Sequence, residues 1–83
     1  MSKWTVEEVE RALAQEVATI LSVDPTVVKP DVPFHSLGME SLGFVELLVF
    51  VENTYGLALI DAGLNRQNSE NLRALARYVC QHT

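Results

Sequence analysis

The chain has 83 residues, 48% of them hydrophobic and 20% charged, so we expect a single domain with a hydrophobic core over residues 1–83. Six basic residues against eleven acidic ones give a net charge of −5, which argues against a nucleic-acid-binding protein because contacts to phosphates need cations. The single cysteine, Cys80, excludes an intramolecular disulfide framework and a multi-cysteine metal site, and we interpret it as a passive helix residue.

A first helix is predicted from Val6 to Leu21. Thr5 and Glu8 have the spacing of a capping box, in which the hydroxyl accepts a backbone N–H of the first turn and the carboxylate reaches back to the cap. Apolar residues then recur at steps of three and four, the pattern of a helix with one buried face. These residues are Val6, Val9, Leu13, Val17, Ile20 and Leu21.

A long loop is predicted to follow, from Ser22 to Met39. It contains three prolines, which lack the N–H that a helix requires. A brief turn of helix is expected at Val27–Val28. Phe34 and Leu37 are expected to anchor the loop on the core, and Gly38 indicates a tight bend of the backbone.

The second main helix, predicted over Ser41–Tyr55 and ended by a left-handed Gly56, has two apolar faces. With successive residues about 100° apart, one face is an ordinary core stripe of Phe44, Leu47, Leu48, Val51 and Tyr55. The opposite side carries a second apolar row interleaved with polar residues: Leu42, Val45 and Val49, beside Glu46, Glu52 and Asn53. Burial on all sides would strand the Glu46 carboxylate in the interior, so we expect the second row to be an exposed interaction surface.

The last main helix is predicted to be capped by Asn68 or Ser69 and to end near Gln81. Its apolar stripe consists of Leu72, Leu75, Ala76 and Val79. A short helix at residues 62–66 is expected before it, and no segment alternates like a strand. The predicted fold class is therefore all-α: a four-helix bundle with three main helices, one short helix and a long loop between helices 1 and 2.

The negative charge is concentrated in the middle of the chain. Between Pro30 and Asn65 there is no lysine or arginine, and five acids there equal the whole net charge: Asp31, Glu40, Glu46, Glu52 and Asp61. This segment is either a solvated surface that aids solubility or a docking surface for basic partners. The second apolar row lies in the same segment, which favours docking.

Ser41 opens the second helix, where a serine is most often an N-cap. As a nucleophile of this chain it lacks a good base, because the histidines are His35 in the loop and His82 in the tail, and no G-x-S-x-G elbow surrounds it. We therefore expect any chemistry on its hydroxyl to be performed by another enzyme. A phosphate attached there would face the free amides and the positive end of the helix dipole.

The segment Leu37–Leu42, which reads LGMESL, resembles the L-G-x-D-S-L signature of acyl carrier proteins. The continuation Phe44–Gly56 is similar to the second helix of that family without a gap, and the resemblance covers roughly residues 5–80. It implies that Ser41 receives 4′-phosphopantetheine from coenzyme A by the action of a phosphopantetheinyl transferase. The thiol of that arm would carry acyl intermediates as thioesters in fatty-acid, polyketide or related biosynthesis. The chain itself would not be an enzyme.

The resemblance also implies a partner-binding surface on the second helix. Its expected residues are Glu40, Leu42, Val45, Glu46, Val49, Glu52 and Asn53. The partners would be the phosphopantetheinyl transferase and acyl-loading, synthase or transferase enzymes with basic docking patches.

Three positions depart from the family pattern or bear on its branches. Glu40 stands where the family usually has Asp, and Asn53 replaces a frequent acid. The spacing from Phe34 to Ser41 is more similar to polyketide or nonribosomal-type carriers, whereas Met39 argues against the peptidyl branch.

Two alternatives belong to other functional classes. The first is an unmodified helical protein-interaction module in which Ser41 is only a helix cap. The second is a small hydrolase that uses Ser41 with His35 as its base. A calcium-binding hand is excluded because the sequence has no D-x-D-x-D-G loop.

The sequence predicts a cytoplasmic protein without a membrane span. Its longest strictly apolar run is Leu47–Val51, far short of the roughly 20 residues that cross a bilayer. No basic N-terminus leads into an apolar stretch, so no signal peptide is expected. We expect the chain to be a monomer.

Overall fold

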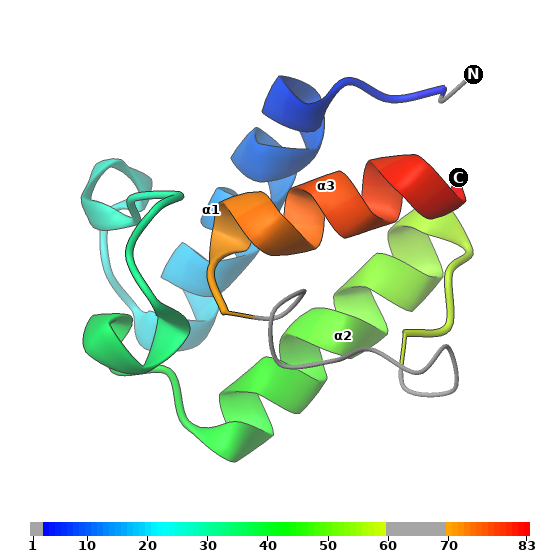
Figure 1. The fold of residues 1–83 in the computed structure, drawn as a ribbon. Coiled ribbons are helices and arrows are strands. Elements are labelled where there is room, and N and C mark those ends of the chain that lie inside the picture. Colours follow the sequence, from blue (N-terminus) through cyan, green and yellow to red (C-terminus); the bar gives the residue numbers. More distant parts are fainter. Residues whose placement is uncertain (1–2, 60–69) are drawn as a thin grey trace.

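The computed structural model describes residues 3–59 and 70–83, where it contains three α-helices and two short 3-10 helices (Figure 1). The first helix, α1, spans Val6–Leu21, as predicted. The N–H of Glu8 donates to the Thr5 hydroxyl at 3.1 Å, and the N–H of Thr5 donates to the Glu8 carboxylate at 3.3 Å. The predicted capping box is therefore present. The helix ends at Ser22, whose left-handed φ of 58° redirects the chain into the loop.

The loop that follows α1 is organised by the two 3-10 helices, η1 (Pro25–Val27) and η2 (Phe34–Leu37). η1 is the brief turn expected at Val27–Val28, although it begins two residues earlier, at the proline. The side chain of Phe34 is only 5% exposed, and Leu37 packs half-buried against the same core. Both residues therefore anchor the loop, as predicted.

The second helix, α2, spans Ser41–Tyr55, again as predicted. Gly56 ends it with a φ of 71°, and its N–H donates to the carbonyl of Glu52 at 2.9 Å. A residue with a Cβ adopts this left-handed conformation only at a cost, which explains the glycine at this end of the helix.

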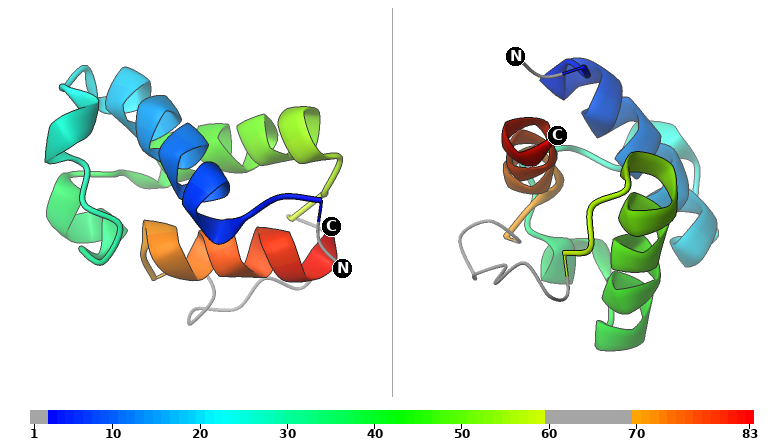
Figure 2. Two further views of the ribbon diagram at one scale, coloured as in Figure 1. Left: turned by 90° about the horizontal axis from the view of Figure 1, so that it is seen from above. Right: turned by 90° about the vertical axis from the view of Figure 1, so that its right-hand side faces the viewer.

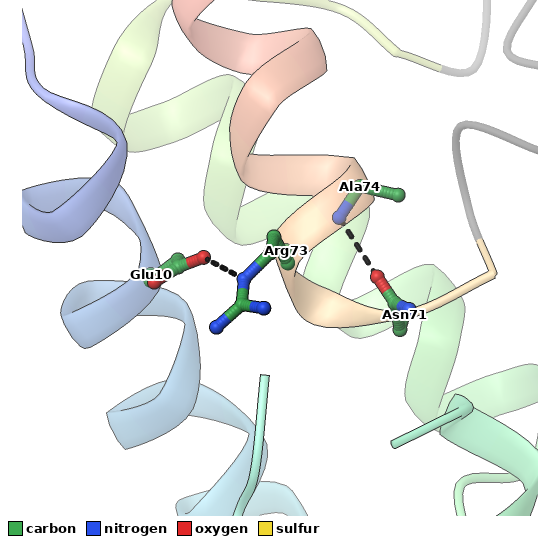
Figure 3. Close-up of polar contacts among 4 residues, drawn as sticks. All are labelled: Glu10, Asn71, Arg73 and Ala74. Atoms are coloured by element: carbon green, nitrogen blue, oxygen red, sulfur yellow. Dashed lines mark hydrogen bonds and ion pairs between the residues drawn. The ribbon is translucent and has the colours of Figure 1, made fainter. Parts of the chain in front are cut away.

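The prediction for the start of the last helix was wrong. Helix α3 spans Leu72–His82, and its N-cap is Asn71, whose side chain accepts the N–H of Ala74 at 2.8 Å (Figure 3). Asn71 is extended because it forms an isolated bridge with Pro33, beside the hydrogen bond from Phe34 N–H to the carbonyl of Glu70. The predicted caps, Asn68 and Ser69, and the predicted short helix at 62–66 lie outside the described residues.

The core lies between the three helices, and α1 packs against both α2 and α3. Figure 2 shows α3 lying across the space between the other two helices. The predicted apolar stripes supply most of the fully buried side chains: Val9, Leu13 and Val17 from α1, Leu47 and Val51 from α2, and Leu72, Leu75, Ala76 and Val79 from α3. Since the inner face of α2 is used in this core, its other side is left to face solvent.

Candidate functional site

Ser41 is the first helical residue of α2, and its side chain is exposed. The N-cap is the preceding residue, Glu40, which is extended and makes no side-chain capping hydrogen bond. The interpretation of Ser41 as an N-cap was therefore wrong by one position. The carbonyl of Glu40 accepts the N–H of Phe44 at 2.9 Å and so begins the helix one residue before the serine. The Ser41 hydroxyl is thus not committed to capping and remains accessible.

The segment before Ser41 is tied to the core. Gly38 has a φ of 88° and donates its N–H to the carbonyl of His35 at 3.2 Å. The next residue, Met39, donates its N–H to the carbonyl of Phe34 at 3.1 Å, and its side chain is only 9% exposed. The serine therefore stands at a fixed place shortly after a closed turn and a buried methionine, rather than on a free loop.

A shallow, open depression of about 390 Å³ lies directly beside Ser41. It is lined by Met39, Glu40, Ser41, Phe44 and Val45. The ring of Phe44 contacts the ring of Phe34 at a centroid distance of 5.4 Å, so an aromatic pair supports this side of the site. A group attached to the serine would therefore begin at the edge of this depression.

The arrangement does not support a hydrolase that uses Ser41 and His35. His35 is exposed on η2 and does not line the depression beside Ser41. Within residues 3–59 and 70–83, no hydrogen bond connects its ring to the serine hydroxyl. A serine nucleophile needs such a base within hydrogen-bond reach, so the residues around Ser41 offer no triad.

The predicted second face of α2 is exposed. Leu42, Val45 and Val49 have 70%, 43% and 42% of their surface accessible, which is unusual for large apolar side chains. The interleaved Glu46, Glu52 and Asn53 are exposed as well, and so is Glu40 at the start of the helix. All seven residues expected at a partner surface are thus accessible, six of them on α2 and Glu40 at its N-cap, and a helix buried on all sides is excluded.

Among the described residues, no cation is paired with the carboxylates of this face. In the described part of the chain, the one ion pair joins Arg73 of α3 to Glu10 of α1, with Nε and Oε2 3.1 Å apart (Figure 3). The cause is the distribution of charge in the sequence, because no lysine or arginine occurs between Pro30 and the end of the first described range. The face of α2 is therefore an apolar row with an acidic border, available to a basic partner.

The sequence analysis did not recognise the packing roles of two residues near the site. Met39, interpreted only as a marker of family branch, belongs to the core. Gly43, which drew no attention, lies where an added Cβ would be 2.9 Å from Sδ of Met39 and 3.1 Å from Cγ2 of Ile20. A glycine inside a helix costs about 1 kcal/mol relative to alanine, and this cost is the signal from which a close contact could have been inferred.

The remaining chemistry-bearing residues form no second centre in the described residues. Cys80 is half-buried, and its Sγ lies 3.5 Å from the carbonyl oxygen of Trp4. No group of three or more histidine, cysteine or acidic side chains there is arranged to bind a metal ion. None of the helices described is long and apolar enough to cross a membrane.

Comparison with known proteins gives a consistent result. The family model for the phosphopantetheine attachment site matches residues 11–79. The acyl carrier protein TtuC of Teredinibacter turnerae is 28% identical over 75 residues, which cover 90% of this chain and 84% of that protein. The acyl carrier protein of Onion yellows phytoplasma is 34% identical over 68 residues, which cover 81% of this chain and 87% of that protein.

A solved structure, that of apo KstB-PCP, has a similar fold. It aligns with a TM-score of 0.77 and covers 94% of this chain and 89% of its own. The sequences are only 21% identical, so this likeness concerns the fold alone. It agrees with the helical architecture predicted from the sequence.

Proposed function

Because the chain belongs to the acyl carrier protein family, which is defined by a phosphopantetheine attachment site, we propose that Ser41 is the residue that carries 4′-phosphopantetheine. The observation that carries this proposal is the exposed hydroxyl of Ser41 at the first position of α2. Members of this family are carriers rather than catalysts, so the chemistry on the serine belongs to a separate transferase.

The attachment step is a substitution at phosphorus. The Ser41 oxygen attacks the phosphate of coenzyme A that bears the pantetheine, and a phosphodiester forms as the bond to the second phosphate breaks. Adenosine 3′,5′-bisphosphate leaves, and a base of the transferase takes the proton of the hydroxyl. The new phosphate lies at the amino end of α2, where the free N–H groups and the helix dipole favour an anion.

The exposed face of α2 is proposed to be the surface on which partners dock. Its apolar row provides contact area, and its carboxylates attract basic residues and set the orientation of the complex. The proposed residues are Glu40, Leu42, Val45, Glu46, Val49, Glu52 and Asn53. The proposed partners are the phosphopantetheinyl transferase and enzymes that load, extend or transfer the acyl group.

The thiol of the arm is proposed to hold acyl intermediates as thioesters in fatty-acid, polyketide or related biosynthesis. Residues 1–83 would act as one carrier domain, as a monomer in the cytoplasm. The loop spacing from Phe34 to Ser41 supports a polyketide-type or nonribosomal-type carrier over the fatty-acid type.

Intact mass spectrometry tests the attachment. The protein is incubated with coenzyme A and a broad-specificity phosphopantetheinyl transferase, and the wild type should gain the mass of one phosphopantetheine. The Ser41→Ala variant should gain none, whereas Ser36→Ala, which removes another exposed loop serine, should be modified like the wild type. A wild-type protein that stays unmodified would favour the alternative, a helical interaction module that is never modified.

A further inference from the structure

Gly43 occupies the third position of α2, and its lack of a side chain leaves a space against the helix. Among the described glycines, Gly38 and Gly56 have a positive φ whereas Gly43 does not, so the backbone conformation does not require a glycine here. An added Cβ would lie 2.9 Å from Sδ of Met39 and 3.1 Å from Cγ2 of Ile20. We call the space between these two side chains and the backbone of Gly43 the Gly43 slot.

Met39 fills the Gly43 slot with its thioether. Its side chain is only 9% exposed, and methionine suits such a gap because its unbranched chain adapts to irregular spaces. Its backbone is held separately, because its N–H donates to the carbonyl of Phe34 at 3.1 Å. A side chain added at position 43 would therefore displace the flexible end of Met39 rather than its backbone.

The Gly43 slot is adjacent to the depression beside Ser41. Met39 precedes the serine by two residues and Gly43 follows it by two, so the contact between them spans the serine. Met39 also lines that depression, together with Phe44 and Val45. When the slot is closed, the open space that Met39 already borders is the depression itself. A displaced thioether would crowd the approach to the Ser41 hydroxyl there.

We propose that Gly43 is a positioning residue for the modification of Ser41. Because it has no side chain, it admits the thioether of Met39 to the slot, and this keeps the depression beside the serine open for the transferase. The inference rests on the proposed function, since it concerns the step that attaches the arm, and it deepens that function by naming a determinant of how fast the step proceeds. Gly43 acts through Met39 and touches neither the arm nor the reacting atoms.

The exposure of the Met39 methyl group measures the first half of the proposal. The sequence has two methionines, so protein labelled with ¹³C at the methionine methyl groups gives at most two signals, and Met39→Val identifies the one from Met39. This signal should resist broadening by a soluble paramagnetic agent in the wild type and should broaden in Gly43→Ala. Alanine favours a helix more than glycine does, so α2 is expected to stay folded in this variant. Equal protection in the two proteins would overturn the proposal.

The transferase assay measures the second half. Gly43→Ala should raise the KM for the carrier about fivefold and change kcat by less than about twofold, because a crowded approach weakens binding without altering the chemistry of the transferase. Ser36→Ala, which changes an exposed residue of the loop before α2, should behave like the wild type. An unchanged KM in Gly43→Ala would refute the positioning role.

Met39→Val distinguishes displacement of the methionine from a direct effect of the new methyl group. Valine ends at the level of Cγ, and Cγ of Met39 lies 4.0 Å from the added Cβ, which is an ordinary contact. In the Met39→Val background, Gly43→Ala should therefore leave the KM unchanged, a coupling that independent effects would not produce. The same rise in KM in both backgrounds would contradict an action of Gly43 through Met39.

The wild-type reaction separates this inference from the proposed function. If Ser41 is modified and Gly43→Ala is modified with the same KM, only the positioning role fails. If Ser41 of the wild type is never modified, the attachment proposal fails and the positioning role fails with it.

Discussion

Gly38 determines where the Ser41 hydroxyl stands. Its φ of 88° closes the turn after η2 and sends the next side chain, Met39, into the core. An added Cβ at Gly38 would meet no atom within 4 Å, so space is not the reason for the glycine. The reason is the left-handed backbone, which costs a residue with a Cβ about 1–2 kcal/mol.

Replacing Gly38 should therefore destabilise the protein through the backbone alone. Gly38→Ala is expected to lower the free energy of unfolding by about 1 kcal/mol. Gly38→Asn should cost less, because asparagine tolerates the left-handed region better. Urea denaturation followed by circular dichroism measures both changes, and equal stability of Gly38→Ala and the wild type would refute the argument.

Single residues were predicted well where the evidence was local. The Thr5–Glu8 capping box follows from two residues three positions apart, and it forms as expected. The N-cap residue is not fixed by such local evidence, because a serine can be either the cap or the first residue of a helix; here Glu40 is the cap and Ser41 is the first helical residue. The burial of Met39 depends on the turn at Gly38, which the sequence indicates but does not orient.

At the scale of elements, long-range contacts decide where α3 begins. The backbone of Glu70 and Asn71 pairs with Pro33 and Phe34 of the loop, and the N–H of Arg73 donates to the carbonyl of Pro30 at 2.9 Å. This pairing fixes Asn71 as the last extended residue and hence as the cap. The bounds of α1 and α2 were predicted correctly because local caps and a terminal glycine set them, whereas residue pairs about 40 positions apart cannot be read from a pattern.

The cap of α3 makes a measurable contribution. Asn71→Ala removes the acceptor of the 2.8 Å hydrogen bond from Ala74 N–H, and it should lower the free energy of unfolding by about 1 kcal/mol. Asn53→Ala serves as the control, because Asn53 is exposed in the body of α2 and its replacement should change stability by less than about 0.5 kcal/mol. Similar losses in the two variants, measured in urea, would contradict the assignment of Asn71 as the cap.

The N-cap of η1, Asp24, predicts that the stability of the folded protein depends on pH. The carboxylate of Asp24 accepts the N–H and the hydroxyl of Thr26 at 2.9 and 2.7 Å, and these hydrogen bonds hold its pKa below the ordinary value of 3.8. A lowered folded-state pKa contributes stability above the unfolded-state pKa, and this stability is lost as the pH falls through the lower folded-state value.

Titration of the Asp24 carboxyl carbon by ¹³C NMR should accordingly give a pKa below 3.8. Thr26→Val keeps the backbone donor but removes the hydroxyl, so it should move the pKa of Asp24 back toward 3.8 without reaching it. An unchanged pKa in this variant would show that the hydroxyl bond does not contribute.

At the scale of the whole molecule, charge is separated by face. Arg73 of α3 pairs with Glu10 of α1, whereas the outer face of α2 carries carboxylates and no lysine or arginine. Such a face attracts a basic partner over a distance set by ionic strength, about 8–10 Å near physiological salt. The apolar row on the same helix then supplies short-range contact.

Reversal of one charge on this face should slow the transferase. Glu46→Lys is expected to lower the kcat/KM for modification of Ser41 about tenfold at low salt, and the difference from the wild type should shrink as salt is raised. Glu7→Lys makes the same change in net charge on the exposed side of α1 and should have little effect. Equal rates for Glu46→Lys and the wild type would contradict docking on α2 while leaving attachment at Ser41 intact.

The helical architecture, the two faces of α2 and the exposed acidic surface all followed from the periodicity and charge of the sequence. The close packing of Ile20 on Gly43 did not, because it arises where one helix meets another. Contacts of this kind depend on how the helices cross, which no single helix pattern contains.

The central claim, that Ser41 carries the arm, is tested most directly by the mass of the peptide that contains it, in protein purified from its natural source. We predict that fragmentation locates a phosphopantetheine group on Ser41, with or without an acyl group on its thiol. A peptide with an unmodified Ser41 in all of the purified protein, or with the group on another residue, would contradict the claim.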